Sequence, residues 1–167
     1  MSVAPVHFKR SCTKHPTGLS LGMQLKRILV PIDFSEQTPL AVREADQLAK
    51  ERGGTVTLFH VHEIVELAFM DFTYVEPPAQ LQAACDAAET RLRDIAGKMQ
   101  TPPERVHVEV ATGSPISEII NASQKHDLVV MPTHGRKGIS HFLMGSVAER
   151  VVRGAKCGVL VVKGSAT

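Results

Sequence analysis

The sequence predicts an α/β fold in which five parallel strands are covered by helices on both faces. Short apolar runs alternate along the chain with longer segments of helical period, and this alternation is typical of a parallel sheet. The runs ILVPI, LVVM and VLVV are apolar at nearly every position, as strands buried on both faces are. At 167 residues, 43% hydrophobic and 22% charged, the chain has the size and composition of one soluble domain.

Five segments have the length and composition of strands. The residues expected in them are 27–32, 55–61, 106–110, 127–131 and 158–163. In the third segment Val106, Val108 and Val110 recur at alternate positions, which is the period of a strand. The others are short and bounded by proline, glycine or charged residues, which excludes long helices there.

Four helical segments separate these strands. Capping signals and terminating glycines or prolines mark their ends. The expected helices start at Ser35 or Thr38 and end before Gly53, span 81–99, start at the Ser114-Pro115 pair, and start at Ser146. Glu149 lies three residues after Ser146, which predicts a capping box at the last of these.

A candidate anion site lies between the fourth strand and the last helix. Its loop contains Gly135, and Gly145-Ser146 precede the helix. Glycine lets backbone amides approach phosphate oxygens, and the first turn of a helix carries unpaired N–H groups and partial positive charge. The same glycines also suit an ordinary turn, so both interpretations stay open. Asp33 likewise follows an apolar strand, and in a parallel sheet it lies at the same edge as Gly135, where ligands bind.

The charge distribution excludes a nucleic-acid-binding surface on the body of the protein. The net charge is +2, and residues 1–22 hold three basic residues and no acidic one, so the rest is close to neutral. We expect 1–22 to be a disordered basic tail and 23–167 to be the domain. No apolar run is long enough to span a membrane. Three cysteines without metal-ligand spacing suit a reducing compartment, so we expect a cytoplasmic protein.

Two long stretches and one short one resemble the universal stress protein family, of the UspA type. They are KRILVPIDFSEQTPLAVREADQLAKERGGTVTLFHV, TGSPISEIINASQKHDLVVMPTHGRKGISHFLMGSVAERVV and the final CGVLVV, and together they cover most of 26–163. The resemblance implies a Rossmann-like, doubly wound sheet of order 3-2-1-4-5 and a homodimer. In one subgroup of the family it also implies bound ATP or AMP, with or without Mg²⁺.

The nucleotide-binding subgroup carries a signature of Gly, two residues, Gly, nine residues, Gly, then Ser or Thr. Gly135, Gly145 and Ser146 fill the later positions, whereas Pro132 stands at the first. By resemblance, the base and ribose would contact Pro31, Ile32 and Asp33, with Val61 and Met131 as apolar walls. The phosphates would contact Gly135, Arg136, Gly145, Ser146 and Val147.

Several residues have alternative interpretations. Asp33 and Ser146 could act only as helix caps. His134 has no nucleophile or second titratable group beside it in the sequence, so we expect no catalytic residue and at most slow ATP hydrolysis. His60, His62 and Glu63 could hold a metal, but alternate strand positions are more often histidine by chance. Residues 63–77 match no regular element and suggest a lid or a contact surface.

Two functions therefore remain. One is a nucleotide-binding module for stress response or signalling. The other is a dimeric scaffold that binds no nucleotide and acts through protein contacts. In either case the apolar strand 158–163 would lie at a sheet edge, and pairing with a second copy across a two-fold axis would protect that edge.

Overall fold

A computed structural model describes residues 25–64, 66–69, 72–133 and 144–163. The expected tail 1–22 and the expected site residues Gly135 and Arg136 lie outside these ranges. The main sheet has five strands: β1 (Arg27–Pro31), β2 (Thr55–His62), β5 (Val106–Thr112), β6 (Leu128–Pro132) and β7 (Gly158–Val162). All neighbours are parallel, and the order is β5-β2-β1-β6-β7. Numbered along the chain, this is the order 3-2-1-4-5, which confirms the expected topology.

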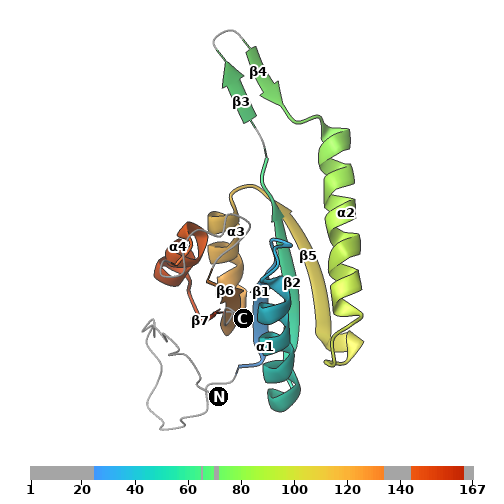
Figure 1. The fold of residues 1–167 in the computed structure, drawn as a ribbon, viewed down its shortest axis with the longest axis vertical. Helices are drawn as coiled ribbons and strands as arrows, with labels where there is room; N and C mark the ends of the chain where they lie inside the picture. The colour runs from blue at the N-terminus through green and yellow to red at the C-terminus, as the bar shows by residue number, and fades with distance from the viewer. Residues whose placement is uncertain (1–24, 65, 70–71, 134–143, 164–167) are drawn as a thin grey trace.

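Four α-helices cover the two faces of this sheet (Figure 1). They are α1 (Thr38–Arg52), α2 (Pro78–Ala96), α3 (Pro115–Ala122) and α4 (Ser146–Gly154), with short 3-10 turns at Pro103–Arg105 and Ser123–Lys125. α1 and α2 pack on one face, and α3 and α4 pack on the other.

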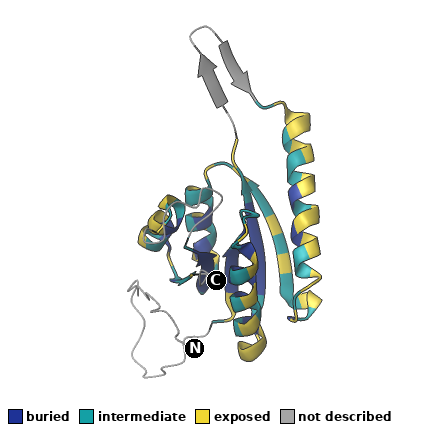
Figure 2. Ribbon diagram, in the orientation of Figure 1, coloured by how far each residue is buried: buried dark blue, intermediate teal, exposed yellow. Residues whose placement is uncertain are grey.

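Alternation along the strands divides the apolar core into two parts. On β1, Ile28 and Val30 pack towards α1 and α2, while Leu29 packs towards α3 and α4. On β6, Val130 likewise packs towards α1 and α2, and Val129 packs towards α3 and α4. Figure 2 shows the buried strands in the middle and the exposed outer surfaces of the helices. The central strands are therefore buried on both faces, as their continuous apolar runs predict.

The helix positions agree with the sequence only in part: α2 covers 78–96 rather than the expected 81–99, and the N-cap of α1 is Gln37 rather than Ser35 or Thr38. α1 begins at Thr38 after Gln37, and α4 begins at Ser146 after Gly145, and neither has a side-chain cap hydrogen bond. The capping-box prediction for Ser146 is wrong because Ser146 is the first helical residue rather than the cap. At the other end of α1, Gly53 has a φ of 66°, so its left-handed conformation ends the helix as expected.

Residues 63–77 contain regular structure that the sequence did not indicate. β3 (Glu66–Phe69) and β4 (Phe72–Val75) form an antiparallel hairpin that projects from the sheet beside the start of α2 (Figure 1). The strands are only four residues long. Such a short segment lacks the alternating pattern over which strand prediction works.

Candidate functional site

The sheet divides at its carboxyl edge between β1 and β6. These strands are paired only at Ile28–Leu128 and Leu29–Val129. β1 stays paired with β2 as far as Pro31, and β6 stays paired with β7 as far as Pro132. The strand order also reverses between β1 and β6, so this split is the topological switch point at which α/β sheets bind ligands.

Two prolines explain why the split opens there. The amide of Ile32 donates to Phe59 of β2, so the alternating backbone of β1 turns the nitrogen of Pro31 towards β6. The amide of Thr133 donates to Val162 of β7, so the nitrogen of Pro132 faces β1. An ordinary residue at either position would donate the next hydrogen bond of the β1–β6 ladder. Proline has no N–H, so neither hydrogen bond can form. The ladder therefore ends early.

On the β1 side, Asp33 lies in a tight turn between β1 and α1. Its Oδ1 accepts hydrogen bonds from the Ser35 amide at 3.0 Å and from the Thr38 hydroxyl at 3.3 Å. These contacts fix the direction of the carboxylate just beyond the end of β1, at the carboxyl edge of the sheet. The cap residue of α1 is Gln37, so Asp33 is not the helix cap. Its hydrogen bonds stabilise the turn that precedes the helix.

On the β6 side, α4 begins at the same edge. The Gly145 amide donates to the carbonyl of Thr133 at 2.8 Å, which brings the start of α4 next to the end of β6. Gly145 has φ −62° and ψ 150°, an extended conformation that any residue adopts. The backbone conformation at this position therefore does not require glycine.

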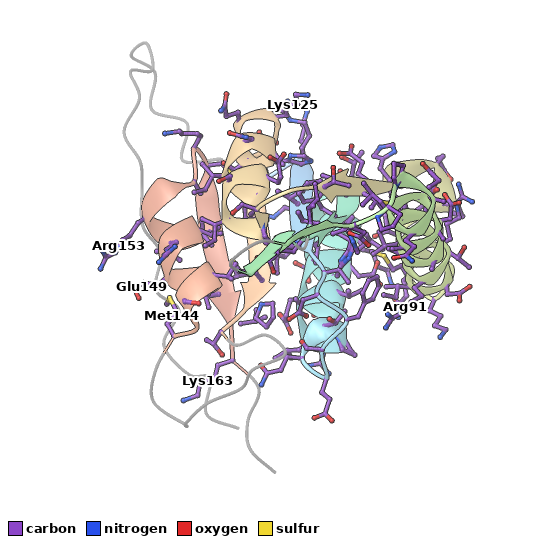
Figure 3. The ribbon with its side chains drawn as sticks, turned by 90° about the horizontal axis from the view of Figure 1, so that it is seen from above. Arg91, Lys125, Met144, Glu149, Arg153 and Lys163 are labelled. Carbon is purple, nitrogen blue, oxygen red and sulfur yellow. The ribbon has the colours of Figure 1, made fainter. Side chains whose placement is uncertain are left out.

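The first turn of α4 carries backbone amides that could meet an anion. The amides of Ser146 and Val147 have no acceptor within the helix. The nearby Glu149 pairs with Arg153 one turn later at 2.7 Å. This ion pair is exposed to solvent, so it offsets the negative charge of Glu149 near the helix start only in part. Figure 3, seen from above, shows Met144 and Glu149 at α4 on one side and Arg91 of α2 on the other.

The other expected site residues lie on different faces of the sheet. Met131 is 5% exposed and packs on the α3–α4 face with the half-buried Val61, so these two share one face of the sheet, on either side of the split. Ile32 is 3% exposed and packs under α1 and α2, where it supports the Asp33 turn. Strand alternation places Pro132 on the α1–α2 side, opposite Met131.

The sequence model of the Universal stress protein family matches residues 24–163. Universal stress protein MJ0531 from Methanocaldococcus jannaschii is 31% identical over 146 residues, which cover 83% of this chain and 82% of that protein. The chain belongs to the universal stress protein family.

Two further comparisons place this universal stress protein among relatives of different lengths. Universal stress protein Mb2028c from Mycobacterium bovis is 34% identical over 145 residues, which are 83% of this chain but only 45% of that protein. A solved universal stress protein in complex with cAMP has the same fold, with a TM-score of 0.63 and 21% identity over 84% of this chain and 98% of that one.

Sequence reasoning missed an aromatic contact next to Asp33 in this universal stress protein. Phe34 has a φ of 59°, a left-handed conformation that is rare for a bulky residue. Its ring lies 4.7 Å from the His60 ring, and the Arg91 guanidinium carbon lies 3.8 Å from its centroid. The Asp-x-Ser pattern could have indicated the turn. Arg91, in contrast, looks in the sequence like a solvated charge on a helix.

Two buried polar atoms in the same turn lack partners within the described residues. They are Ser35 Oγ and Gln37 Oε1. Buried polar atoms are nearly always hydrogen-bonded, so each exception requires an explanation, such as a bound water, ion or ligand. The turn after β1 thus combines an unusual backbone conformation with two buried polar atoms that have no partner in the described protein.

The histidines of β2 have structural partners. His60 Nδ1 lies 2.7 Å from the carbonyl oxygen of Ile32. Because a carbonyl oxygen can only accept, Nδ1 carries the proton. His62 Nε2 lies 3.0 Å from a carboxylate oxygen of Glu76, and this pair connects the end of β2 to the start of α2. Within the described ranges, no group of three potential ligands is arranged to hold a metal, and no helix is long and apolar enough to cross a membrane.

Proposed function

We propose that this universal stress protein binds an adenine nucleotide, ATP or AMP, in the split between β1 and β6. The observation that carries this proposal is the arrangement of the split itself. The Asp33 carboxylate lies on one side, and the glycine-led first turn of α4 lies on the other. A carboxylate accepts hydrogen bonds from ribose hydroxyls, and helix-start amides bind phosphate.

Each part of the nucleotide has a place in this proposal. The ribose lies by Asp33, and the base lies over the end of β1, where Pro31 and Ile32 form the floor. Val61 and Met131 line the apolar side. The phosphates meet the amides of Gly145, Ser146 and Val147, together with Gly135 and Arg136 from the glycine-containing loop, and a Mg²⁺ ion can accompany ATP there.

The comparisons support the class of ligand. The structural relative described above was solved in complex with cAMP, which is itself an adenine nucleotide. Three of the four signature positions are also present in this chain. A site of this kind holds and releases a nucleotide, so the proposed role is a stress-response or signalling module whose state depends on the nucleotide rather than an enzyme.

The proposal extends to assembly and location. We place a homodimer at the outer edge of β7, because that apolar strand is paired on one side only within the described sheet and an unpaired edge favours self-association. The free thiols of Cys85 and Cys157 suit the reducing cytoplasm. The family match from residue 24 supports a domain over 23–167 preceded by the basic tail 1–22.

Analysis of co-purified ligand tests the nucleotide directly. The purified protein is precipitated with acid, and the supernatant is separated by ion-exchange chromatography against ATP, ADP, AMP and cAMP standards. We expect an adenine nucleotide in the wild type and a much smaller amount in Gly145→Val, whose side chain blocks the phosphates. Equal amounts from both proteins would contradict the proposed position.

A scaffold that binds no nucleotide is the second candidate, and Pro132 is the observation that favours it. Proline at the first signature position offers no N–H and adds a ring where the family has glycine. If this candidate is correct, the wild type releases no nucleotide, takes up none from millimolar solutions, and still dimerises.

A further inference from the structure

The turn that carries Asp33 holds its shape at an energetic cost. Phe34, the next residue, adopts a φ of 59°. A non-glycine residue in this left-handed region is strained, and such strain persists only where the surroundings enforce it. Some contact must therefore keep Phe34 in place.

The Phe34 ring has two contacts that can enforce this conformation. The His60 ring lies at 4.7 Å with an angle of 43° between the planes, and His60 is itself fixed by its 2.7 Å contact with the Ile32 carbonyl oxygen. The Arg91 guanidinium lies over the ring at 3.8 Å from its centroid. This distance is well within the range of a cation–π interaction. Phe34 also packs against the core under α1 and α2.

Arg91 belongs to α2, which is far from Asp33 in the sequence. Among the described residues no ion pair involves Arg91, whereas Arg93, two positions later, pairs with Glu89 at 2.6 Å. The Arg91 cation is thus directed to the ring rather than to a carboxylate. The Ser35 amide, immediately after Phe34, donates to the Asp33 carboxylate at 3.0 Å, so the backbone at Phe34 is connected directly to that carboxylate.

We propose that Arg91 is a positioning residue through which α2 sets the Asp33 turn, and thereby controls nucleotide affinity at the split. This inference rests on the proposed function for the identity of the ligand, but the link from Arg91 to the turn is independent of it. Because coupling between two sites is reciprocal, nucleotide binding would in turn restrain α2.

Two substitutions on the same helix test the link. Arg91→Met keeps most of the length of the side chain and removes the cation. Arg93→Met is the matched control, because Arg93 is also exposed and contacts Glu89 instead. The first readout is hydrogen exchange of the Ser35 amide by NMR in nucleotide-free protein. The second is the ATP dissociation constant by calorimetry.

We expect Arg91→Met to accelerate exchange at Ser35 and to weaken ATP binding, each about twofold to fivefold, the range that a cation–π contact supplies. Arg93→Met should change neither, and Arg91→Lys should restore most of both. Phe34→Ala should produce a larger effect than Arg91→Met, because it removes the ring and all of its contacts.

The outcomes separate this inference from the proposed function. If Arg91→Met and Arg93→Met give the same Ser35 exchange rate, Arg91 does not position the turn. If Phe34→Ala leaves Ser35 as protected as in the wild type, the ring does not hold it either, and the inference is wrong. If the wild type binds no ATP while Arg91→Met still accelerates exchange, the positioning role stands and the nucleotide proposal fails.

Discussion

Pro31 and Pro132 flank the gap between β1 and β6, and both lack the backbone donor that would close it. Continuing the ladder would require Pro31 to donate to Val130 and Pro132 to donate to Pro31. The early end of β1–β6 pairing at the switch point is thus encoded by two residues that offer no N–H. Pro132 contributes to this opening even though it departs from the glycine of the family signature.

Replacing Pro132 with glycine should tighten ATP binding about fivefold to tenfold. Glycine supplies one N–H on the nucleotide side and removes the ring, and one such contact contributes on the order of 1 kcal/mol. Pro31 still lacks its donor in this variant, so the split stays open. Calorimetry measures the change, with Pro132→Ala as a control that regains the N–H and keeps a Cβ. Affinity unchanged in both variants would mean that position 132 does not face the ligand.

Sequence patterns located the backbone of the site better than its side-chain contacts. Asp33 and Gly135 were expected at one edge because parallel strands align their carboxyl ends. Gly135 lies outside the described residues, but Asp33 and the start of α4 at Gly145 do follow β1 and β6 at that edge. The left-handed conformation of Phe34 could not be expected, because nothing in its own residue type favours it. The contact that we infer to enforce it comes from Arg91, which is distant in sequence, and contacts of that kind do not show in a local pattern.

The joints between α1, β2 and the segment after α2 hold together the amino edge of the sheet, opposite the split. α1 leads into β2 through Gly54, whose amide donates to Ala49 at 2.9 Å. A Cβ on Gly54 would lie 2.9 Å from the carbonyl oxygen of Lys26, a backbone atom that cannot move away by rotating a side chain.

A second joint involves Asp46 of α1. Its carboxylate accepts hydrogen bonds from the amides of Gln100 and Thr101, both at 2.8 Å, and so connects α1 to the segment after α2.

Gly54→Ala should lower the free energy of unfolding by about 1–3 kcal/mol, the usual cost of forcing an extra methyl group into a packed site. Gly97→Ala is the matched control. Gly97 follows α2, and a Cβ there meets its nearest atom at 3.5 Å, an ordinary contact. Urea unfolding monitored by circular dichroism measures both, and equal stabilities of the two variants would show that the α1–β2 joint can relax.

Asp46 should contribute to stability in a pH-dependent way. Burial raises the pKa of its carboxyl, but the hydrogen bonds from Gln100 and Thr101 outweigh this effect and leave the pKa below its usual value. A lowered folded-state pKa stabilises the protein above the unfolded pKa, at about pH 4, and this contribution is lost as the pH falls through the folded value.

Unfolding followed from about pH 6 to about pH 2 checks this prediction in the wild type, in Asp46→Asn and in a control. The control is Asp94→Asn, which changes an exposed aspartate on α2. We expect the stability of Asp46→Asn to depend less steeply on pH below about pH 4 than that of the wild type and the control. Three parallel curves would assign the acid sensitivity to other carboxylates. Asp127 is the alternative, because hydrogen bonds from Arg27 overcome its burial and also lower its pKa.

At the scale of the whole molecule, the described sheet has two edges of different character. β5 lies at one edge and alternates half-buried valines with exposed polar residues beside α2, whereas β7 is apolar along its whole length. The Thr133 amide donates to Val162, so the backbone groups of Leu160 also face β6, and those of Val161 face outward. Val161 therefore presents an outward backbone edge for a second copy.

Val161→Pro should give a folded monomer, because it removes an outward N–H and leaves the β6–β7 ladder intact. Leu160→Pro is the contrasting variant: it removes a donor to β6 and should lower the melting temperature as well. Size-exclusion chromatography with light scattering gives the mass of each. A Val161→Pro variant that remains dimeric would show that the dimer forms elsewhere.

The overall architecture was accessible from sequence because long-range order in this fold follows from local patterns. Apolar runs such as 128–131 identify strands buried on both faces, and their alternation with helices specifies a parallel sheet. The order of the strands came from the family resemblance and is confirmed. The β3–β4 hairpin was missed because its strands are four residues long and outside the main sheet.

Titration of ATP into nucleotide-free protein by isothermal calorimetry tests the central claim most directly. The account predicts saturable heat with one nucleotide per chain for the wild type. It predicts none for Gly145→Val at the same melting temperature, since the backbone at Gly145 is extended and valine favours extended backbone. If the wild type gives no heat with millimolar ATP or AMP and Pro132→Gly restores none, the split between β1 and β6 is not a nucleotide site.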